Sequence, residues 1–178
     1  PSIEALFTID EETGMTGAKE LSADLLEGEI LLNLDTEEDD EIGIGCAGGV
    51  DITATKEYSV VDTPKDSTGY KLVVKGLQGG HSGMDIIKEL GNANKIMNRL
   101  LYEANQQFNF LISSISGGSL RNAIPRESFS SLAVLNKDQN AFENYITKSS
   151  DIIRKEFLSL EPNLDISFEK CETPEKTI

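Results

Sequence analysis

The stretch Phe7-Thr8-Ile9-Asp10-Glu11-Glu12-Thr13-Gly14 begins as an apolar run and ends in three consecutive carboxylates and a turn. Adjacent carboxylates repel each other unless a cation or water screens them. Where a strand breaks into a turn, two successive side chains can reach one site. Glu11 and Glu12 can therefore serve one site, with one carboxylate binding a metal ion while the other accepts a proton from a water molecule. A solvated acidic turn is the alternative interpretation.

A second acidic strand end follows a helix-like interval. Residues 3–9 and 29–34 have the composition of buried strands, residues 14–26 are predicted to form a short helix, and Asp35 follows the second strand directly. In open α/β sheets, ligands bind at the carboxyl ends of the strands. We therefore expect Glu12 and Asp35 to lie side by side.

These residues carry a family resemblance. The run Thr-Ile-Asp-Glu-Glu-Thr-Gly, the Leu-Asn-Leu-Asp after it and Gly45-Cys46-Ala47-Gly48-Gly49 resemble the aminoacyl-histidine dipeptidases, a branch of the two-zinc metallopeptidases that include aminoacylase and carboxypeptidase types. The resemblance implies that Glu11 is the general base, that Glu12 binds one zinc ion and that Asp35 binds the other.

The net charge of −15 is unevenly distributed over the 178 residues. Residues 1–41 contain 14 acidic residues and one lysine, which gives −13 and leaves −2 for the remainder. Clustered Lys and Arg are needed for phosphate contacts, so the composition argues against a nucleic-acid partner.

No run of 18 apolar residues is present, so no membrane span is expected. Cys46 and Cys171 lack metal-finger spacing, and we interpret them as free thiols of a cytoplasmic protein, although a disulfide stays open.

The acidic block at 36–41 is interpreted as a solvated loop, and the glycines at 43–49 as a crossover between domains. Beyond it the pattern predicts strands at 51–62, 69–76, 108–116 and 127–135, and a last strand around 164–169. A helix is predicted from about Gly83 to Ala104, started by a capping box of Ser82 and Asp85, and a second helix is capped by Asp138.

The order β-β-α-β-β-α-β fits a mostly antiparallel sheet with two helices on one face, which resembles the lid domain of the same metallopeptidases. The sequence therefore predicts a fold of the α/β and α+β classes. The resemblance implies that residues 1–48 are the rear part of a zinc-peptidase catalytic domain, and we expect residues 49–178 to be a lid domain that is incomplete at its C-terminus.

His81 is the single histidine, in Leu77-Gln78-Gly79-Gly80-His81-Ser82-Gly83. A lone histidine is usually structural or solvated. The glycines, however, offer little core for a ring, and a following helix N-terminus favours anions. The resemblance implies that His81 stabilises the oxyanion of the tetrahedral intermediate.

The stretch Gly117-Gly118-Ser119-Leu120-Arg121-Asn122-Ala123-Ile124-Pro125 is either a plain connection between strands or a substrate-binding segment. The family's Gly-Gly…Asn-x-Ile-Pro segment resembles it, which implies that Asn122 contacts substrate. Arg121 could pair with a substrate carboxylate.

The family's remaining zinc ligands have no counterpart in this sequence, so the chain is interpreted as an internal fragment. Catalytic zinc usually has three protein ligands. We therefore expect the isolated chain to be inactive and to bind zinc weakly. The parent enzyme is expected to hold two zinc ions, to hydrolyse Xaa-His dipeptides and to form a homodimer through the lid.

Two alternatives stay open. The parent could be a related hydrolase such as a tripeptidase, aminoacylase or carboxypeptidase. Residues 50–178 could instead act as a dimerisation module without catalysis.

Overall fold

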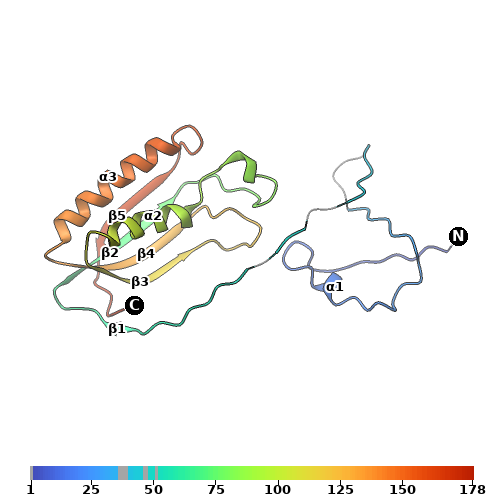
Figure 1. Ribbon diagram of the computed structural model, residues 1–178, viewed down its shortest axis with the longest axis horizontal. Helices are drawn as coiled ribbons and strands as arrows, with labels where there is room; N and C mark the ends of the chain where they lie inside the picture. Colours follow the sequence, from blue (N-terminus) through green and yellow to red (C-terminus); the bar gives the residue numbers. More distant parts are fainter. Residues whose placement is uncertain (1, 36–39, 46–47, 51) are drawn as a thin grey trace. The chain divides into compact units, whose positions relative to one another are not determined.

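The structure is a computed structural model that describes residues 2–35, 40–45, 48–50 and 52–178 (Figure 1). It consists of two units, residues 1–56 and 57–178, which are described separately. The acidic residues at 36–39 and Cys46 lie outside the described residues. Within the described ranges, no helix is both long enough and apolar enough to cross a membrane.

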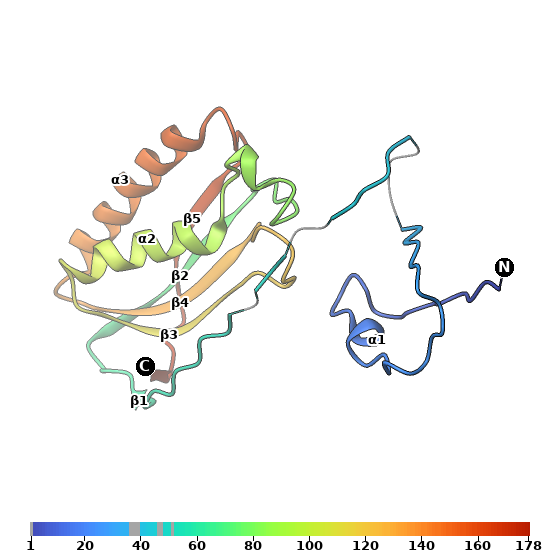
Figure 2. The ribbon, with the colours of Figure 1, turned by 45° about the vertical axis from the view of Figure 1, so that its right-hand side comes forward.

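The larger unit is built on a four-stranded antiparallel sheet in the order β3-β4-β2-β5. Its strands are β2 Ser67–Lys75, β3 Phe110–Gly117, β4 Ser128–Leu135 and β5 Asp165–Cys171. The helices α2 Ala93–Asn105 and α3 Gln139–Phe157 lie over one face of this sheet (Figure 2). The predicted architecture, a mostly antiparallel sheet with two helices on one face, is confirmed.

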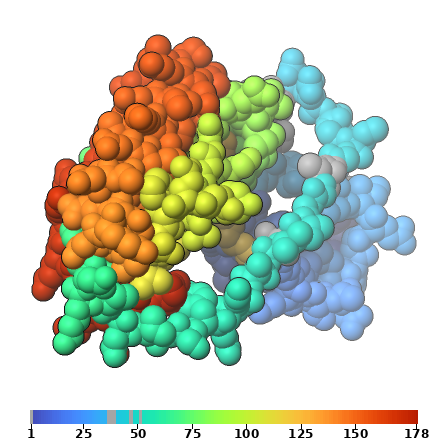
Figure 3. Space-filling view, turned by 60° about the vertical axis from the view of Figure 1, so that its left-hand side comes forward, coloured from blue at the N-terminus to red at the C-terminus, as the bar shows by residue number. Residues whose placement is uncertain are grey.

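The core lies between the helices and the sheet. Each helix has apolar side chains at steps of three and four, which form one buried stripe, while alternate strand residues face the helices. The fully buried side chains include Tyr70, Leu72, Val74, Met97, Leu100, Leu132, Val134, Phe142, Ile146 and Ile153. The two helices also contact each other, and Figure 3 shows α3 (orange) and α2 (yellow) as neighbours.

The first long helix begins later than predicted. Instead of one helix from Gly83, the chain forms a short 3-10 helix, η1 Ile86–Lys88, and then breaks at Glu89, whose φ is 54°. Helix α2 starts after Asn92, whose side chain accepts a hydrogen bond from the Lys95 N–H at 3.1 Å. The predicted capping box of Ser82 and Asp85 is therefore wrong, because an asparagine just before the apolar stripe satisfies the free N–H groups of the helix better.

We expect Asn92→Ala to lower the free energy of unfolding by about 1 kcal/mol, because the mutation removes the N-cap hydrogen bond of α2. Urea unfolding followed by circular dichroism measures this loss. Asn98→Ala, on the exposed face of the same helix, is the matched control and should leave stability nearly unchanged. Equal losses in the two variants would contradict the capping role.

The strand predicted at 51–62 is much shorter than expected. Only β1 Val61–Asp62 forms, and it pairs with β6 Lys176–Thr177, a strand that the sequence did not predict. The chain after β6 also contacts the sheet, since the Ile178 N–H donates to the Ile112 carbonyl of β3 at 2.8 Å. Cys171, at the end of β5, is an exposed free thiol, as predicted.

The smaller unit differs from the strands predicted at 3–9 and 29–34 and from the helix predicted at 14–26. Its described residues contain no strand, and the predicted helix shrinks to α1 Thr16–Lys19. Phe7 is 90% exposed and Leu34 is 86% exposed, so the apolar runs do not pack on a core. An apolar run becomes a buried strand only where partner strands and covering helices exist, and within this unit none does.

Candidate active-site loops

His81 lies in a loop that leaves the end of β2 and reaches η1. The chain turns there at Gly76 and Gly79, whose φ angles are 79° and 70°. A Cβ atom on Gly79 would lie 2.4 Å from Cγ of the Arg126 side chain, and its positive φ is a conformation that other residues rarely adopt, so both features favour glycine here. The glycines flanking His81 therefore set the path of the loop, as the sequence indicated.

The imidazole of His81 is folded back over its own turn. Its Nδ1 atom accepts hydrogen bonds from the N–H groups of Gly83 and Met84, both at 3.1 Å. A ring nitrogen that accepts hydrogen bonds carries no proton, so the neutral ring has its proton on Nε2. His81 is exposed, and this tautomer leaves an N–H donor on the outer side of the loop.

Asp85 holds the backbone of the same turn. Its Oδ2 atom accepts a hydrogen bond from the His81 N–H at 2.7 Å, and its Oδ1 atom lies 2.6 Å from Nζ of Lys88. The Lys88 ammonium, and next the His81 N–H, hold the pKa of Asp85 below its ordinary value. The sequence assigned Asp85 to a helix cap, whereas the structure assigns it to the His81 turn.

We expect the His81 turn to loosen in acid. Because the pKa of Asp85 is lowered in the folded state, its stabilisation is complete above the ordinary carboxyl pKa and is lost as pH falls through the lowered value. The amide signal of His81, followed by NMR during an acid titration, should report this loss. In Asp85→Asn the transition should disappear, and its persistence would contradict the assignment.

The structure brings the Asn122 loop against the His81 loop. The Ser82 N–H donates to the Asn122 carbonyl at 2.7 Å, the Ile124 N–H donates to the Gly80 carbonyl at 2.8 Å, and His81 forms a β-bridge with Ala123. Both loops lie at the same end of the sheet (Figures 1 and 2). The two segments that the sequence singled out independently therefore form one structural feature.

Asn122 is half-buried in this pair of loops, and Arg121 beside it is exposed. The Gly117-Gly118 turn that precedes them borders an open hollow of about 440 Å³, which Arg126, Glu127 and Phe129 also line. The two loops thus carry an amide, a guanidinium group and an imidazole N–H donor, which are groups of the kind that bind carboxylate and carbonyl oxygens.

The three predicted site residues of the smaller unit, Glu11, Glu12 and Asp35, do not form a comparable cluster. Glu11 and Glu12 lie in a turn closed by hydrogen bonds from Gly14 and Met15 to the Asp10 carbonyl, and both are exposed. Asp35 is also exposed, and its N–H donates to Oδ1 of Asn33 at 3.1 Å. Across the described ranges, no three His, Cys, Asp or Glu side chains form a group that could hold a metal ion. Carboxylates suit zinc in type, but these residues do not make a complete zinc site.

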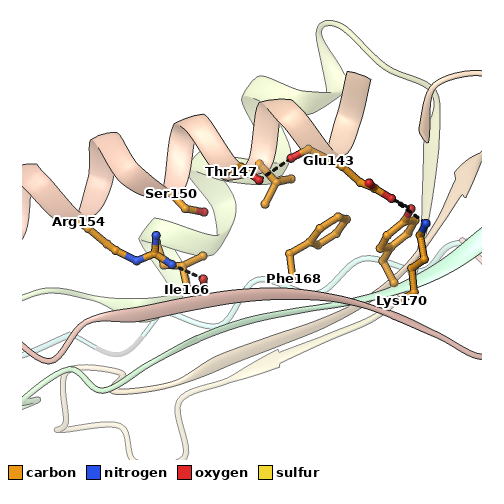
Figure 4. A pocket seen from close by; sticks show the side chains of 9 residues that line it. Glu143, Thr147, Ser150, Arg154, Ile166, Phe168 and Lys170 are labelled. Carbon is orange, nitrogen blue, oxygen red and sulfur yellow. Dashed lines mark hydrogen bonds and ion pairs between the residues drawn. The ribbon is translucent and has the colours of Figure 1, made fainter. Parts of the chain in front are cut away.

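A second hollow, of about 330 Å³, lies between α3 and β5 (Figure 4). Polar contacts link its lining residues: Tyr70 donates a hydrogen bond to Glu143, which also pairs with Lys170 at 3.2 Å. The Tyr70 hydrogen bond lowers the pKa of Glu143, while burial raises the pKa of Tyr70. Arg154 donates to the Ile166 carbonyl at 2.5 Å. We interpret these polar contacts as structural, because they attach α3 to the sheet.

The larger unit is a two-layer α+β domain of order β-α-β-β-α-β that carries a paired histidine and asparagine loop at one end. Residues 65–161 match the model of the peptidase dimerisation domain, and the chain belongs to this family.

Two relatives extend the comparison to nearly the whole chain. The sequence is 40% identical over 162 residues to the cytosol non-specific dipeptidase of Escherichia coli (strain K12), a match that covers 91% of this chain and 33% of that protein. The structure matches the crystal structure of aminoacylhistidine dipeptidase from Vibrio alginolyticus with a TM-score of 0.74 and 38% identity, over 96% of this chain and 35% of that one. The chain thus spans about one third of each relative, and the predicted resemblance is confirmed.

Proposed function

We propose that the protein containing this chain is a zinc-dependent dipeptidase of the cytoplasm that hydrolyses Xaa-His dipeptides. The observation that carries the proposal is the His81 turn, where backbone N–H groups bind Nδ1 and leave the Nε2 proton available to an oxygen of the substrate. Support also comes from the relatives, one described as a non-specific dipeptidase and the other as an aminoacylhistidine dipeptidase.

In this proposal residues 1–48 belong to a catalytic domain and residues 49–178 to its lid. The structural division after Lys56 lies close to this boundary. Glu11 accepts the proton of the attacking water and passes it to the leaving amine, while Glu12 would bind one of two zinc ions and Asp35 would bind the other. When bound, zinc polarises a peptide carbonyl and acidifies water.

The roles in the lid follow from hydrogen-bond chemistry. His81 donates its Nε2 proton to the oxyanion that develops on the peptide carbonyl, an interaction that grows stronger as charge accumulates. Asn122, beside it, has a side-chain amide that can both donate and accept hydrogen bonds. The guanidinium group of Arg121 has two parallel N–H donors that match the two oxygens of the C-terminal carboxylate of a dipeptide.

The zinc proposal predicts a weak interaction with this chain alone. Calorimetric titration of zinc at neutral pH should show little binding, because the described residues do not bring three ligands together. Glu12→Ala and Asp35→Ala variants should be indistinguishable from the parent chain. Tight binding that both substitutions abolish would mean that the chain assembles a zinc site by itself, contrary to this account.

The proposed activity is tested with the full-length protein and a panel of substrates: Xaa-His dipeptides, other dipeptides, tripeptides and N-acylated amino acids. Faster hydrolysis of Xaa-His dipeptides than of the other classes, lost on chelation and restored by zinc, is the expected result. Equal rates for all dipeptides would favour a non-specific dipeptidase. A preference for acylated amino acids or tripeptides would replace the proposal by a related hydrolase.

A second candidate function, dimerisation through the larger unit, is favoured by the match of residues 65–161 to the peptidase dimerisation domain. We propose a homodimer. Sedimentation velocity of the chain over a range of concentrations should show a species of twice the monomer mass. A strict monomer at the highest concentration would exclude self-association by this stretch.

A further inference from the structure

Glu161 is a carboxylate in the interior of the larger unit. It follows α3 closely and is only 2% exposed. Its own N–H donates to the Phe157 carbonyl at 2.7 Å, which continues the last turn of the helix. A buried carboxylate is costly unless hydrogen bonds satisfy both of its oxygens.

Two backbone N–H groups meet this requirement, and they belong to the two ends of the His81 loop. Oε2 of Glu161 accepts from the Gln78 N–H at 2.9 Å, and Oε1 accepts from the Gly91 N–H at 2.8 Å. Gln78 precedes His81 by three residues, and Gly91 directly precedes the N-cap of α2. One side chain therefore fastens both the entry and the exit of the segment 78–91.

The neighbours of Glu161 reinforce these attachments. The Gln78 side chain donates to the Leu160 carbonyl, so both the backbone and the side chain of this residue bind the 160–161 segment. A Cβ atom on Gly91 would lie 3.2 Å from Cγ of Glu161 and 2.6 Å from Cδ2 of Leu77. Glycine at position 91 thus permits the close approach that brings its N–H to the carboxylate.

Little else holds this segment to the core. Residues 81–84 and 86–89 are all exposed, and the large apolar side chains Met84, Ile86 and Ile87 are 60% to 84% exposed. Hydrophobic packing therefore cannot fix the place of His81. Its position depends on the Glu161 hydrogen bonds at the ends of the segment, on the local hydrogen bond to Asp85 and on the contact with the Asn122 loop.

We propose that Glu161 is the positioning residue of His81: by holding the N–H groups of Gln78 and Gly91, it keeps the His81 turn in the geometry that directs the Nε2 proton outward. This inference rests on the proposed catalytic role of His81. Glu161 does not contact substrate in this scheme and acts only through the loop.

The test uses Glu161→Gln and Glu161→Ala in this chain, labelled with ¹⁵N. Because His81 is the single histidine, the two ring nitrogens give one set of signals in a long-range ¹H–¹⁵N spectrum at mildly alkaline pH. We expect the parent chain to show one protonated and one unprotonated nitrogen. In Glu161→Ala the two shifts should move toward each other as the tautomers average, and the amides of Gln78 and Gly91 should exchange faster with solvent.

Glu169→Gln is the matched control, because Glu169 is an exposed carboxylate on β5 in the same domain. It should leave the His81 signals unchanged. Glu161→Gln keeps the shape of the side chain and removes one hydrogen-bond acceptor, so we expect smaller changes in the His81 shifts and in amide exchange. This variant replaces Glu161→Ala in the test if the alanine variant does not fold.

In the full-length enzyme, Glu161→Ala should lower kcat by up to about 100-fold with a much smaller change in KM, since a misplaced group costs rate rather than binding. If stability falls but the His81 signals and kcat stay as in the parent, Glu161 is merely structural and the proposal is overturned. If the His81 signals change while kcat does not, the positioning role stands and the catalytic role of His81 is refuted.

Discussion

His81→Ala is expected to lower kcat of the full-length enzyme by about 10² to 10³-fold, which corresponds to about 2.7–4 kcal/mol of transition-state stabilisation. In the proposed mechanism, the two hydrogen bonds to Nδ1 leave the proton of His81 on Nε2, where it would meet an oxyanion that exists only during the reaction. An interaction made only in the transition state changes kcat and leaves KM nearly constant. Steady-state kinetics on a dipeptide substrate measures both constants.

Two variants make this measurement specific. Ser82→Ala changes an exposed neighbour whose backbone N–H still binds the Asn122 carbonyl, so it should retain parental kcat. His81→Gln can still donate a hydrogen bond and should recover part of the lost rate. Because the His81 ring is exposed, none of these changes should move the melting temperature appreciably. A His81→Ala enzyme with parental kcat would refute the catalytic role.

Phe142→Ala should be the most damaging substitution for stability, with a loss of about 3–5 kcal/mol in the free energy of unfolding. The Phe142 ring is fully buried on the inner face of α3. Its centroid lies 5.6 Å from Phe108, 5.2 Å from Phe110 and 5.6 Å from Phe168, so it joins β3, β5 and the chain before β3. Alanine would leave a cavity between β3 with the residues just before it and β5, and the three remaining rings cannot fill it.

Urea denaturation measures this loss, with Ile152→Ala as the control. Ile152 lies on the same helix but is 53% exposed, and its truncation should cost less than about 1 kcal/mol. If the two variants lost equal stability, the helix would not depend on its buried stripe, and the description of the core would be wrong.

The fold of the larger unit could be predicted because its hydrophobic patterns are regular. The apolar positions of α3 recur at helical spacing, and Leu164, Ile166 and Phe168 alternate with polar residues, so both elements were identifiable before any contact was known. The start of α2 was missed because Ile86 extends the apolar stripe in sequence, although its side chain is 60% exposed. The break depends on Glu89 adopting a positive φ, which the pattern does not encode.

The strands predicted in residues 3–9 and 29–34 failed for a different reason. An apolar run indicates a tendency to be buried, but it does not supply the partner strand that a sheet needs. In the smaller unit the Glu4 carboxylate instead accepts hydrogen bonds from the N–H groups of Glu27 and Gly28, so a side chain links the first apolar run to the residues just before the second. Local sequence therefore identified the apolar runs and not their pairing.

The His81 and Asn122 loops were found from their glycines, and the structure places them in contact. Asp85 and Glu161 were missed as supports of His81. Glu161 lies 83 residues from Gln78 and 70 from Gly91, and a glutamate after a helix has the pattern of a solvated charge. Only the tertiary structure shows that it is buried and that both of its oxygens accept hydrogen bonds from the loop.

The measurement that tests the central claim most directly is the long-range ¹H–¹⁵N spectrum of the single histidine in the unmodified chain. The account predicts an unprotonated Nδ1 and a protonated Nε2, with the Nε2 tautomer predominant, because the Gly83 and Met84 N–H groups bind Nδ1. Averaged shifts of the kind that a freely solvated imidazole gives, or a proton on Nδ1, would contradict the claim that the turn holds His81 as an outward donor.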